Sequence, residues 1–203
     1  DDQRQAAGQV LYVLDPYINL DSQTADGLDF GLAASFDAGA IGRFDVDLES
    51  TYLMTLNVVR NEQLEELAQD PAFAGEFATL AVDRIELNGN PKWRTSASLR
   101  WRKDQFGAGA SLRHVSGYDN TSADLDQDND GIPEFWRVDS NMRVSVYGEY
   151  RIKIAPDDSL RLRFGVNNVL DEAPPLLDQS LGYDSTYHSV KGREFYFQAT
   201  ASF

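Results

Sequence analysis

The sequence of 203 residues contains no cysteine, only two histidines and no run of 18 consecutive apolar residues. The lack of cysteine excludes disulfide bonds and thiolate metal sites. A transmembrane helix needs about 20 predominantly apolar residues, so the sequence contains no such helix. The first residues, "DDQRQAAG", also lack the basic, apolar and small-residue regions of a secretory signal peptide. We therefore expect a chain that is processed or that forms a segment of a larger protein.

Groups suited to catalysis are equally scarce. His114 and His188 are the two histidines, and neither is accompanied by a nucleophile motif or by metal-ligand spacing. A lone histidine more commonly forms a structural hydrogen bond in a loop. The sequence therefore predicts no enzyme, no catalytic residue and no bound cofactor.

The formal net charge of −15 argues against a nucleic-acid partner, because phosphate binding requires clustered Lys and Arg. The charge is concentrated in three segments. Residues 60–90 carry seven acids and two bases, residues 118–135 carry six acids and residues 170–190 carry four acids. Their charges of −5, −6 and −4 sum to −15, so the rest of the chain is neutral.

Between these acidic segments, apolar and polar residues alternate, which predicts β-strands with one apolar and one polar face. In "RFDVDLESTYLMTL", for example, Phe44, Val46 and Leu48 alternate with charged residues. Scarcely any long helical pattern is present, although "NEQLEELAQD" predicts a short helix in a loop. About eight strands are predicted, at residues 9–19, 25–38, 43–56, 92–102, 106–117, 137–153, 160–170 and 193–203.

The connections between the predicted strands alternate in length. Long segments at 58–91, 118–136 and 170–190 alternate with short turns at 38–42, 103–105 and 155–159. Several strands reach the ~9 to 11 residues that a tilted membrane-spanning strand needs. The mean hydropathy of −0.43 does not oppose this, because the polar residues that face the lumen lower the average. We predict an all-β fold, an antiparallel transmembrane β-barrel segment of about eight strands with long outer loops and short periplasmic turns; a soluble β-sandwich is the alternative.

Alternation also assigns individual side chains to faces. Leu48, Leu99, Val144 and Phe197 are expected to face lipid, and Asp47, Arg100, Arg143 and Gln198 to face the lumen. Carboxylates in the lumen-facing rows are expected to balance arginines of neighbouring strands, namely Arg94, Arg100, Arg143, Arg151 and Arg163.

Several motifs, in this order, resemble the C-terminal part of the barrel of the TonB-dependent outer-membrane receptors. They are "INLDSQTADGLDFGLAASF", "GNPKWRTSASLRW", "RVDSNMRVSVYGEYRI", "FGVNNVLDEAPP", "YDSTYH" and "GREFYFQATASF". The family's barrel has about 22 strands around an amino-terminal plug. This chain has about eight strands and no plug, so the resemblance implies that residues 1–203 form the C-terminal β-barrel portion of a larger receptor.

The resemblance also implies a function and a location. A receptor of this family lies in the outer membrane of a Gram-negative bacterium and imports a scarce nutrient, such as siderophore-bound iron, cobalamin or an oligosaccharide. Its partners are membrane lipid, the plug and other barrel strands, the TonB complex acting through the plug, the outer-membrane assembly machinery and the small-molecule nutrient. The terminal Phe203 is the expected assembly signal. The alternatives are a stand-alone eight-stranded barrel with a structural or adhesive role, and an outer-membrane enzyme.

Two candidate binding sites lie in the predicted outer loops. "DLDQDNDGIPE" spaces acidic residues around a glycine as a Ca²⁺ loop does, with candidate ligands Asp124, Asp126, Asp128, Asp130 and Glu134. Arg137 occupies the position where a closing bidentate acid is expected, so a plain solvated loop is the alternative. Trp136, Tyr183 and Tyr187 border the outer loops and are candidate contacts for a ligand in the vestibule, although aromatic residues also gather at membrane interfaces.

Overall fold

The computed structural model describes residues 22–59, 83–125 and 134–203. These residues form nine strands and one turn of 3-10 helix, η1 (Gly39–Ile41). The strands are β1 (Ser22–Asp37), β2 (Arg43–Val59), β3 (Trp93–Lys103), β4 (Phe106–Val115), β5 (Tyr118–Leu125), β6 (Glu134–Val138), β7 (Asn141–Lys153), β8 (Ser159–Asn167) and β9 (Glu194–Ser202).

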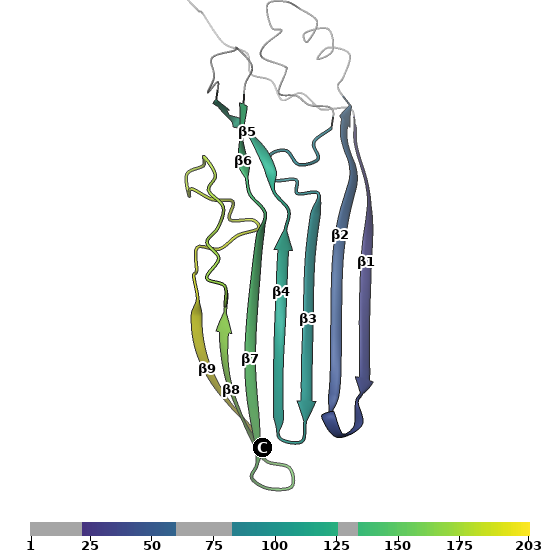
Figure 1. Ribbon diagram of the computed structural model, residues 1–203, viewed down its shortest axis with the longest axis vertical. Helices are drawn as coiled ribbons and strands as arrows, with labels where there is room; N and C mark the ends of the chain where they lie inside the picture. Colours follow the sequence, from purple (N-terminus) through teal and green to yellow (C-terminus); the bar gives the residue numbers. More distant parts are fainter. Residues whose placement is uncertain (1–21, 60–82, 126–133) are drawn as a thin grey trace, which may run out of the picture.

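Seven of the strands form one antiparallel sheet in the order β1-β2-β3-β4-β7-β8-β9, and β5 pairs with β6 in a small second sheet. Figure 1 shows the three short turns at one end of the large sheet and the long connections at the other. We call these the turn end and the loop end. The predicted all-β, antiparallel barrel segment with alternating short and long connections is confirmed.

The prediction for residues 118–136 was wrong in one respect. This segment was expected to be a loop, but β5 and β6 form a ladder within it, with a register shift between Asn120 and Asp124. The strand "YDNTSADL" is mainly polar in sequence and shows no apolar alternation; backbone pairing with β6 and the buried side chains of Tyr118 and Asn120 hold it. The strand predicted at 9–19 and the helix predicted at 61–70 lie outside the described residues.

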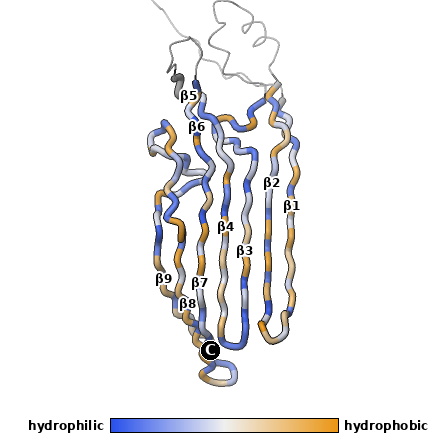
Figure 2. Tube along the Cα trace, in the orientation of Figure 1, coloured by the Kyte–Doolittle hydropathy of each residue, from blue (hydrophilic) through white to orange (hydrophobic). Residues whose placement is uncertain are grey.

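The strand register separates an apolar from a polar face as predicted. Leu48 lies in a continuous row, Leu32–Leu48–Ala97–Leu112–Val144, across five strands. Leu99 and Phe197 lie on the same face, whereas Asp47, Arg100, Arg143 and Gln198 lie on the other. Figure 2 shows the resulting alternation of hydrophobic and hydrophilic positions along the strands.

The apolar face has no protein layer covering it in the described part of the chain. Phe30, Phe36, Phe164 and Phe197 are between 51% and 68% exposed there. The buried hydrophobic residues instead gather at the loop end; among the described residues they are Leu56, Val58, Val115, Tyr118, Val138 and Leu177. No helix in the described residues is long and apolar enough to cross a membrane. The hydrophobic core is therefore small and lies beneath the long connections.

Local backbone geometry closes the tight turns. Gly42, after η1, has a φ of 106°, and a Cβ there would collide with the carbonyl oxygen of Arg102 on β3. Asp104 adopts a φ of 50° in the turn between β3 and β4. Asp is among the residues that tolerate this left-handed conformation. These two residues permit the sharp reversals that bring neighbouring strands into register.

Candidate ligand vestibule at the loop end

Ion pairs connect neighbouring strands on the polar face of the sheet toward the turn end. Asp45 accepts hydrogen bonds from Arg43 at 3.3 Å and from Arg102 at 2.8 Å. Asp47 pairs with Arg100 at 3.1 Å, and Glu149 pairs with Arg163 at 2.6 Å. These contacts confirm the predicted charge balance for Arg100 and Arg163. Opposite charges on adjacent strands stabilise the sheet.

The same prediction was wrong for Arg94, Arg143 and Arg151. Within the described residues no carboxylate lies within ion-pairing distance of these guanidinium groups, nor of Arg113. The register places Arg113 directly opposite Arg143 at the loop end, and Arg151 directly opposite Arg161 near the turn end. Among the described residues, these two directly opposed arginine pairs of the polar face lack a carboxylate partner, one at each end, whereas the opposed Arg43 and Arg102 share Asp45.

The connection between β8 and β9, residues 168–193, packs over the polar face at the loop end. We call it the β8–β9 loop. Its backbone accepts hydrogen bonds from Asn141 and Trp136, through the carbonyl oxygens of Ala173 at 3.0 Å and Leu176 at 2.9 Å. At its far side, the Tyr187 hydroxyl donates to the carbonyl oxygen of Gly89 at 2.9 Å. Contacts with β6, β7 and the β2–β3 connection hold the loop in place.

A charged hydrogen bond fixes the centre of the β8–β9 loop. The hydroxyl of Tyr118, which is 1% exposed, donates to Asp184 Oδ2 at 2.6 Å. Burial and this hydrogen bond raise the pKa of Tyr118 well above its ordinary value. Burial alone would raise the pKa of Asp184, but hydrogen bonds from Tyr118 and Thr186 outweigh it and lower that pKa. Asp184 therefore remains a carboxylate and Tyr118 a neutral donor near pH 7.

His188 lies buried in the same loop, with 7% of its surface exposed, and neither ring nitrogen has a hydrogen-bond partner among the described residues. Burial lowers its pKa, the nearby Asp184 raises it and Arg143 lowers it further; the net shift is downward from 6.5. The imidazole is therefore neutral near pH 7. Sequence reasoning had expected a loop histidine whose ring forms a hydrogen bond. In the part of the chain that the structure describes, the ring instead contacts Tyr187, at 6.4 Å between centroids.

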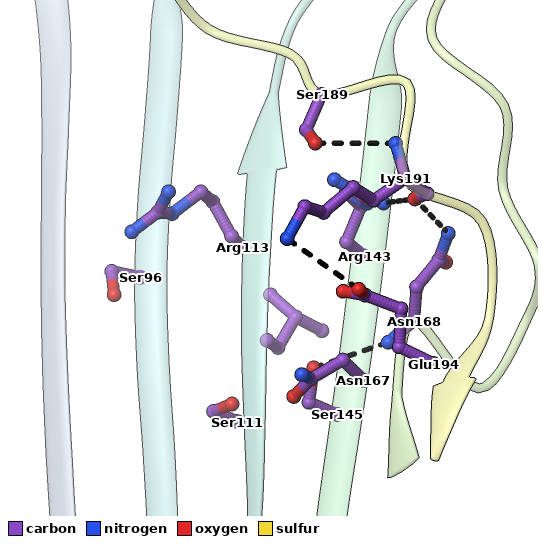
Figure 3. Close-up of a pocket in the computed structure, with 11 residues that line it drawn as sticks. Ser96, Ser111, Arg113, Arg143, Ser145, Asn167, Asn168, Ser189, Lys191 and Glu194 are labelled. Atoms are coloured by element: carbon purple, nitrogen blue, oxygen red, sulfur yellow. Dashed lines mark hydrogen bonds and ion pairs between the residues drawn. The ribbon is translucent and has the colours of Figure 1, made fainter. Parts of the chain in front are cut away.

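Two cavities lie between the β8–β9 loop and the sheet. The smaller, of about 290 Å³, is lined mainly by polar and charged side chains of β3, β4, β7 and the loop. In Figure 3, Arg113 extends toward Ser96, and Arg143 lies beside Lys191. The larger, of about 510 Å³, reaches from Glu49 and Arg94 to Tyr187. Ser96 and Arg113 line both, so the cavities adjoin. Their lining is rich in hydrogen-bond donors, which suits a polar ligand.

The predicted vestibule aromatics occupy different positions. Tyr187 lines the 510 Å³ cavity and a third cavity, of about 570 Å³, beside β5. Trp136 packs against the buried cluster of Tyr118, Val138 and Leu177, and Tyr183 lies partly exposed in the β8–β9 loop. Ligand contact by these three residues stays a prediction. The arginines were missed as candidates because their pairing depends on which strands are neighbours.

Candidate calcium ligands Asp126, Asp128 and Asp130 lie outside the described residues. Asp124 and Glu134 lie at the ends of β5 and β6 that border this gap, where Asp124 pairs with Phe135 and Leu125 with Glu134. Among the described residues, no group of three His, Cys, Asp or Glu side chains could hold a metal ion. Phe203 follows β9 and is 96% exposed. The Ca²⁺ loop and the assembly signal therefore stay predictions.

The seven-stranded sheet exposes its apolar face, and the β8–β9 loop covers its polar face at the loop end. This is the arrangement of a wall segment of a large β-barrel. The family model described as TonB dependent receptor-like, beta-barrel matches residues 1–169. The chain belongs to this family of TonB-dependent receptors, as the sequence motifs had predicted.

A solved structure supports the same fold. The chain is similar to a mutant of the ferric enterobactin receptor from Pseudomonas aeruginosa, with a TM-score of 0.52 and 17% sequence identity. The similarity covers 91% of this chain and 23% of that receptor, so the chain spans less than a quarter of its length. A comparison with curated proteins gave no match.

Proposed function

We propose that this chain spans the outer membrane of a Gram-negative bacterium as the C-terminal portion, residues 1–203, of a TonB-dependent receptor. The exposed apolar face supports this proposal. Soluble monomers rarely expose contiguous apolar patches larger than a few hundred Å². Exposure of Phe30, Phe164 and Phe197 to water is unfavourable, whereas exposure to lipid tails is not.

Aromatic contacts near both ends of the sheet agree with this location. Tyr52 and Trp93 contact each other at 5.1 Å between ring centroids, and Phe36 stacks on Phe44 at 5.3 Å. Trp93 and Trp101 lie on the same face of β3, eight residues apart. At a rise of about 3.3 Å per residue they are separated by about 26 Å along the strand, which is about 20 Å along the membrane normal for a strand tilted by about 40°. Outer-membrane barrels have an apolar band about 25 Å tall between two aromatic girdles.

Membership in the family supports a transport role for the complete receptor. The complete receptor would bind a scarce nutrient at its outer loops, such as siderophore-bound iron, cobalamin or an oligosaccharide. It would import the nutrient through movement of its plug, driven by the TonB complex, after insertion by the outer-membrane assembly machinery. The donor-lined cavities beside Arg113 and Tyr187 are the part of this chain that such a ligand would reach. No feature of the described residues favours the stand-alone eight-stranded barrel.

Uptake by whole cells tests the proposal. Cells that carry the complete receptor, and matched cells that lack it, would be given labelled ferric siderophores, cobalamin and oligosaccharides. We expect one class to accumulate only in the cells with the receptor, and a protonophore to abolish accumulation because uptake requires inner-membrane energy. Equal accumulation of every class in both strains, or accumulation that the protonophore does not affect, would contradict energy-coupled uptake.

A further inference from the structure

The wall of the 290 Å³ cavity is positively charged, although the whole chain has a net charge of −15. Arg113, Arg143 and Lys191 line it, and the one carboxylate present, Glu194, lies 3.5 Å from the Lys191 ammonium group. Glu194 can therefore balance Lys191, and no other carboxylate of the described residues pairs with either guanidinium group. This local excess of two positive charges is opposite in sign to the protein as a whole.

The two guanidinium groups lie on directly opposite residues of adjacent strands. Like charges at such positions destabilise a sheet, so their placement calls for a negative partner. Arg143 donates one hydrogen bond to the carbonyl oxygen of Lys191, which anchors its side chain beneath the β8–β9 loop. A guanidinium group has five N–H donors, so further donors remain available.

Neutral donors complete the lining of this cavity, as Figure 3 shows. The Ser145 hydroxyl accepts a hydrogen bond from the backbone N–H of Asn168 at 3.3 Å, and the Ser189 hydroxyl accepts one from that of Lys191 at 3.2 Å. Each hydroxyl has therefore used an acceptor site and keeps its own proton to donate. Ser96 and Ser111 contribute two more hydroxyl groups.

We propose that Arg113 and Arg143 form an anion-binding site that takes a carboxylate or phosphate group of a ligand entering from the loop end. Guanidinium groups bind both anions through paired, charge-assisted hydrogen bonds. Arg94 lines the adjoining cavity, which shares Arg113 with this one. A ligand with at least two acidic groups could therefore bind at Arg143 and Arg94 together. This inference rests on the proposed role of the chain in a receptor and names the chemical class of its ligand.

Binding of two simple anions to the complete receptor, purified in detergent micelles, tests the site. Citrate serves as the carboxylate probe and inorganic pyrophosphate as the phosphate probe, each followed by calorimetry. We expect at least one of them to bind. Arg113→Gln and Arg143→Gln should each weaken binding about tenfold or more, because each removes charge-assisted hydrogen bonds. Arg113→Lys should restore part of the affinity through charge alone.

Arg151→Gln is the matched control, because Arg151 is also an unpaired arginine on the polar face that opposes another arginine, Arg161, but lies near the turn end. It should leave the affinity unchanged. Failure of both anions to bind, or an equal loss of affinity in Arg151→Gln, would overturn the proposal.

A second measurement needs no variant and so does not depend on assembly of the altered barrels. Phenylglyoxal modifies accessible arginines, and peptide mass spectrometry locates the modified residues. A bound anion should protect Arg113 and Arg143 but not Arg151, and equal reaction with and without anion would overturn the site. Both assays measure binding without cellular energy. Anion binding without uptake would therefore refute the transport role alone, whereas uptake without anion binding would refute this site alone.

Discussion

Replacing Tyr118 by Phe would remove the hydroxyl that donates to Asp184 at 2.6 Å and leave the buried ring in place. Asp184 would retain the backbone N–H of Thr186, at 2.8 Å, as a donor. Hydrogen bonds to charged groups contribute about 1.5 to 3 kcal/mol. Because the Asp184 side chain is only partly buried and water can replace the lost donor, we expect a cost near the lower part of that range, about 2 kcal/mol.

This cost should appear as easier opening of the β8–β9 loop rather than as unfolding of the sheet. A change of about 2 kcal/mol raises the exchange rate of amide hydrogens about 30-fold where local opening limits exchange. The amide of His188 donates to the carbonyl oxygen of Asp184 at 3.0 Å and reports directly on this region. Hydrogen exchange of the complete receptor, read by mass spectrometry, measures it.

Tyr187→Phe provides the comparison, because its hydroxyl donates to the neutral carbonyl oxygen of Gly89 at 2.9 Å. A neutral hydrogen bond contributes about 1 kcal/mol, so exchange should rise only about fivefold. The amide of Val169, which donates to Val144 at the base of the loop, should be unaffected in both variants. Unchanged His188 exchange in Tyr118→Phe, or a larger effect from Tyr187→Phe, would refute the central role of the charged hydrogen bond.

Four further predictions concern other parts of the chain. The depressed pKa of His188 means that the open loop binds the proton more readily, so the opening equilibrium of the loop, obtained from exchange after correction for the intrinsic pH dependence of amide exchange, should increase as the pH falls below 6.5. An opening equilibrium that does not change between pH 7 and 5 would argue against this. Leu48 lies midway between the aromatic rows on the apolar face. Leu48→Arg should therefore lower the free energy of unfolding of the receptor in vesicles by about 2 to 4 kcal/mol. An unchanged free energy of unfolding would show that Leu48 does not face lipid. Deletion of Phe203 should reduce the amount of receptor in the outer membrane without altering ligand affinity, and normal surface levels would exclude an assembly role. Calorimetry should detect Ca²⁺ binding at about 10⁻⁴ to 10⁻³ M that Asp126→Asn with Asp128→Asn abolishes; identical heats for both proteins would leave a solvated acidic loop.

The strands of the large sheet could be predicted from the sequence because their signal is local. Apolar and polar residues that alternate along a strand show which side chains lie on each face of the sheet. This alternation identified the faces of Leu48, Asp47 and Arg100 correctly. The ladder of β5 and β6 could not be predicted in this way. Its residues are mainly polar, and the burial of Tyr118 depends on Leu177 in a distant loop.

The arginine cluster was missed for a related reason. Its geometry depends on β4 pairing with β7, which sets Arg113 opposite Arg143 after the chain has passed through β5 and β6. The sequence shows that both residues belong to polar rows but not that the two rows are adjacent. Local periodicity therefore predicted the sheet wall and its faces, whereas the candidate site arises from contacts between segments far apart in the chain.

The same pairing has a consequence for how this protein can evolve. The chain leaves the large sheet after Val115 and returns at Asn141, and these two residues are direct partners in the ladder. The two ends of the excursion therefore meet whatever its length, and doubling a flexible excursion costs only about 0.6 kcal/mol in closure entropy. Insertions or deletions between Tyr118 and Trp136, which both contact the β8–β9 loop, would leave the register of β4 and β7 intact. Natural selection could thus vary the length of this loop-end excursion while the large sheet stays constant.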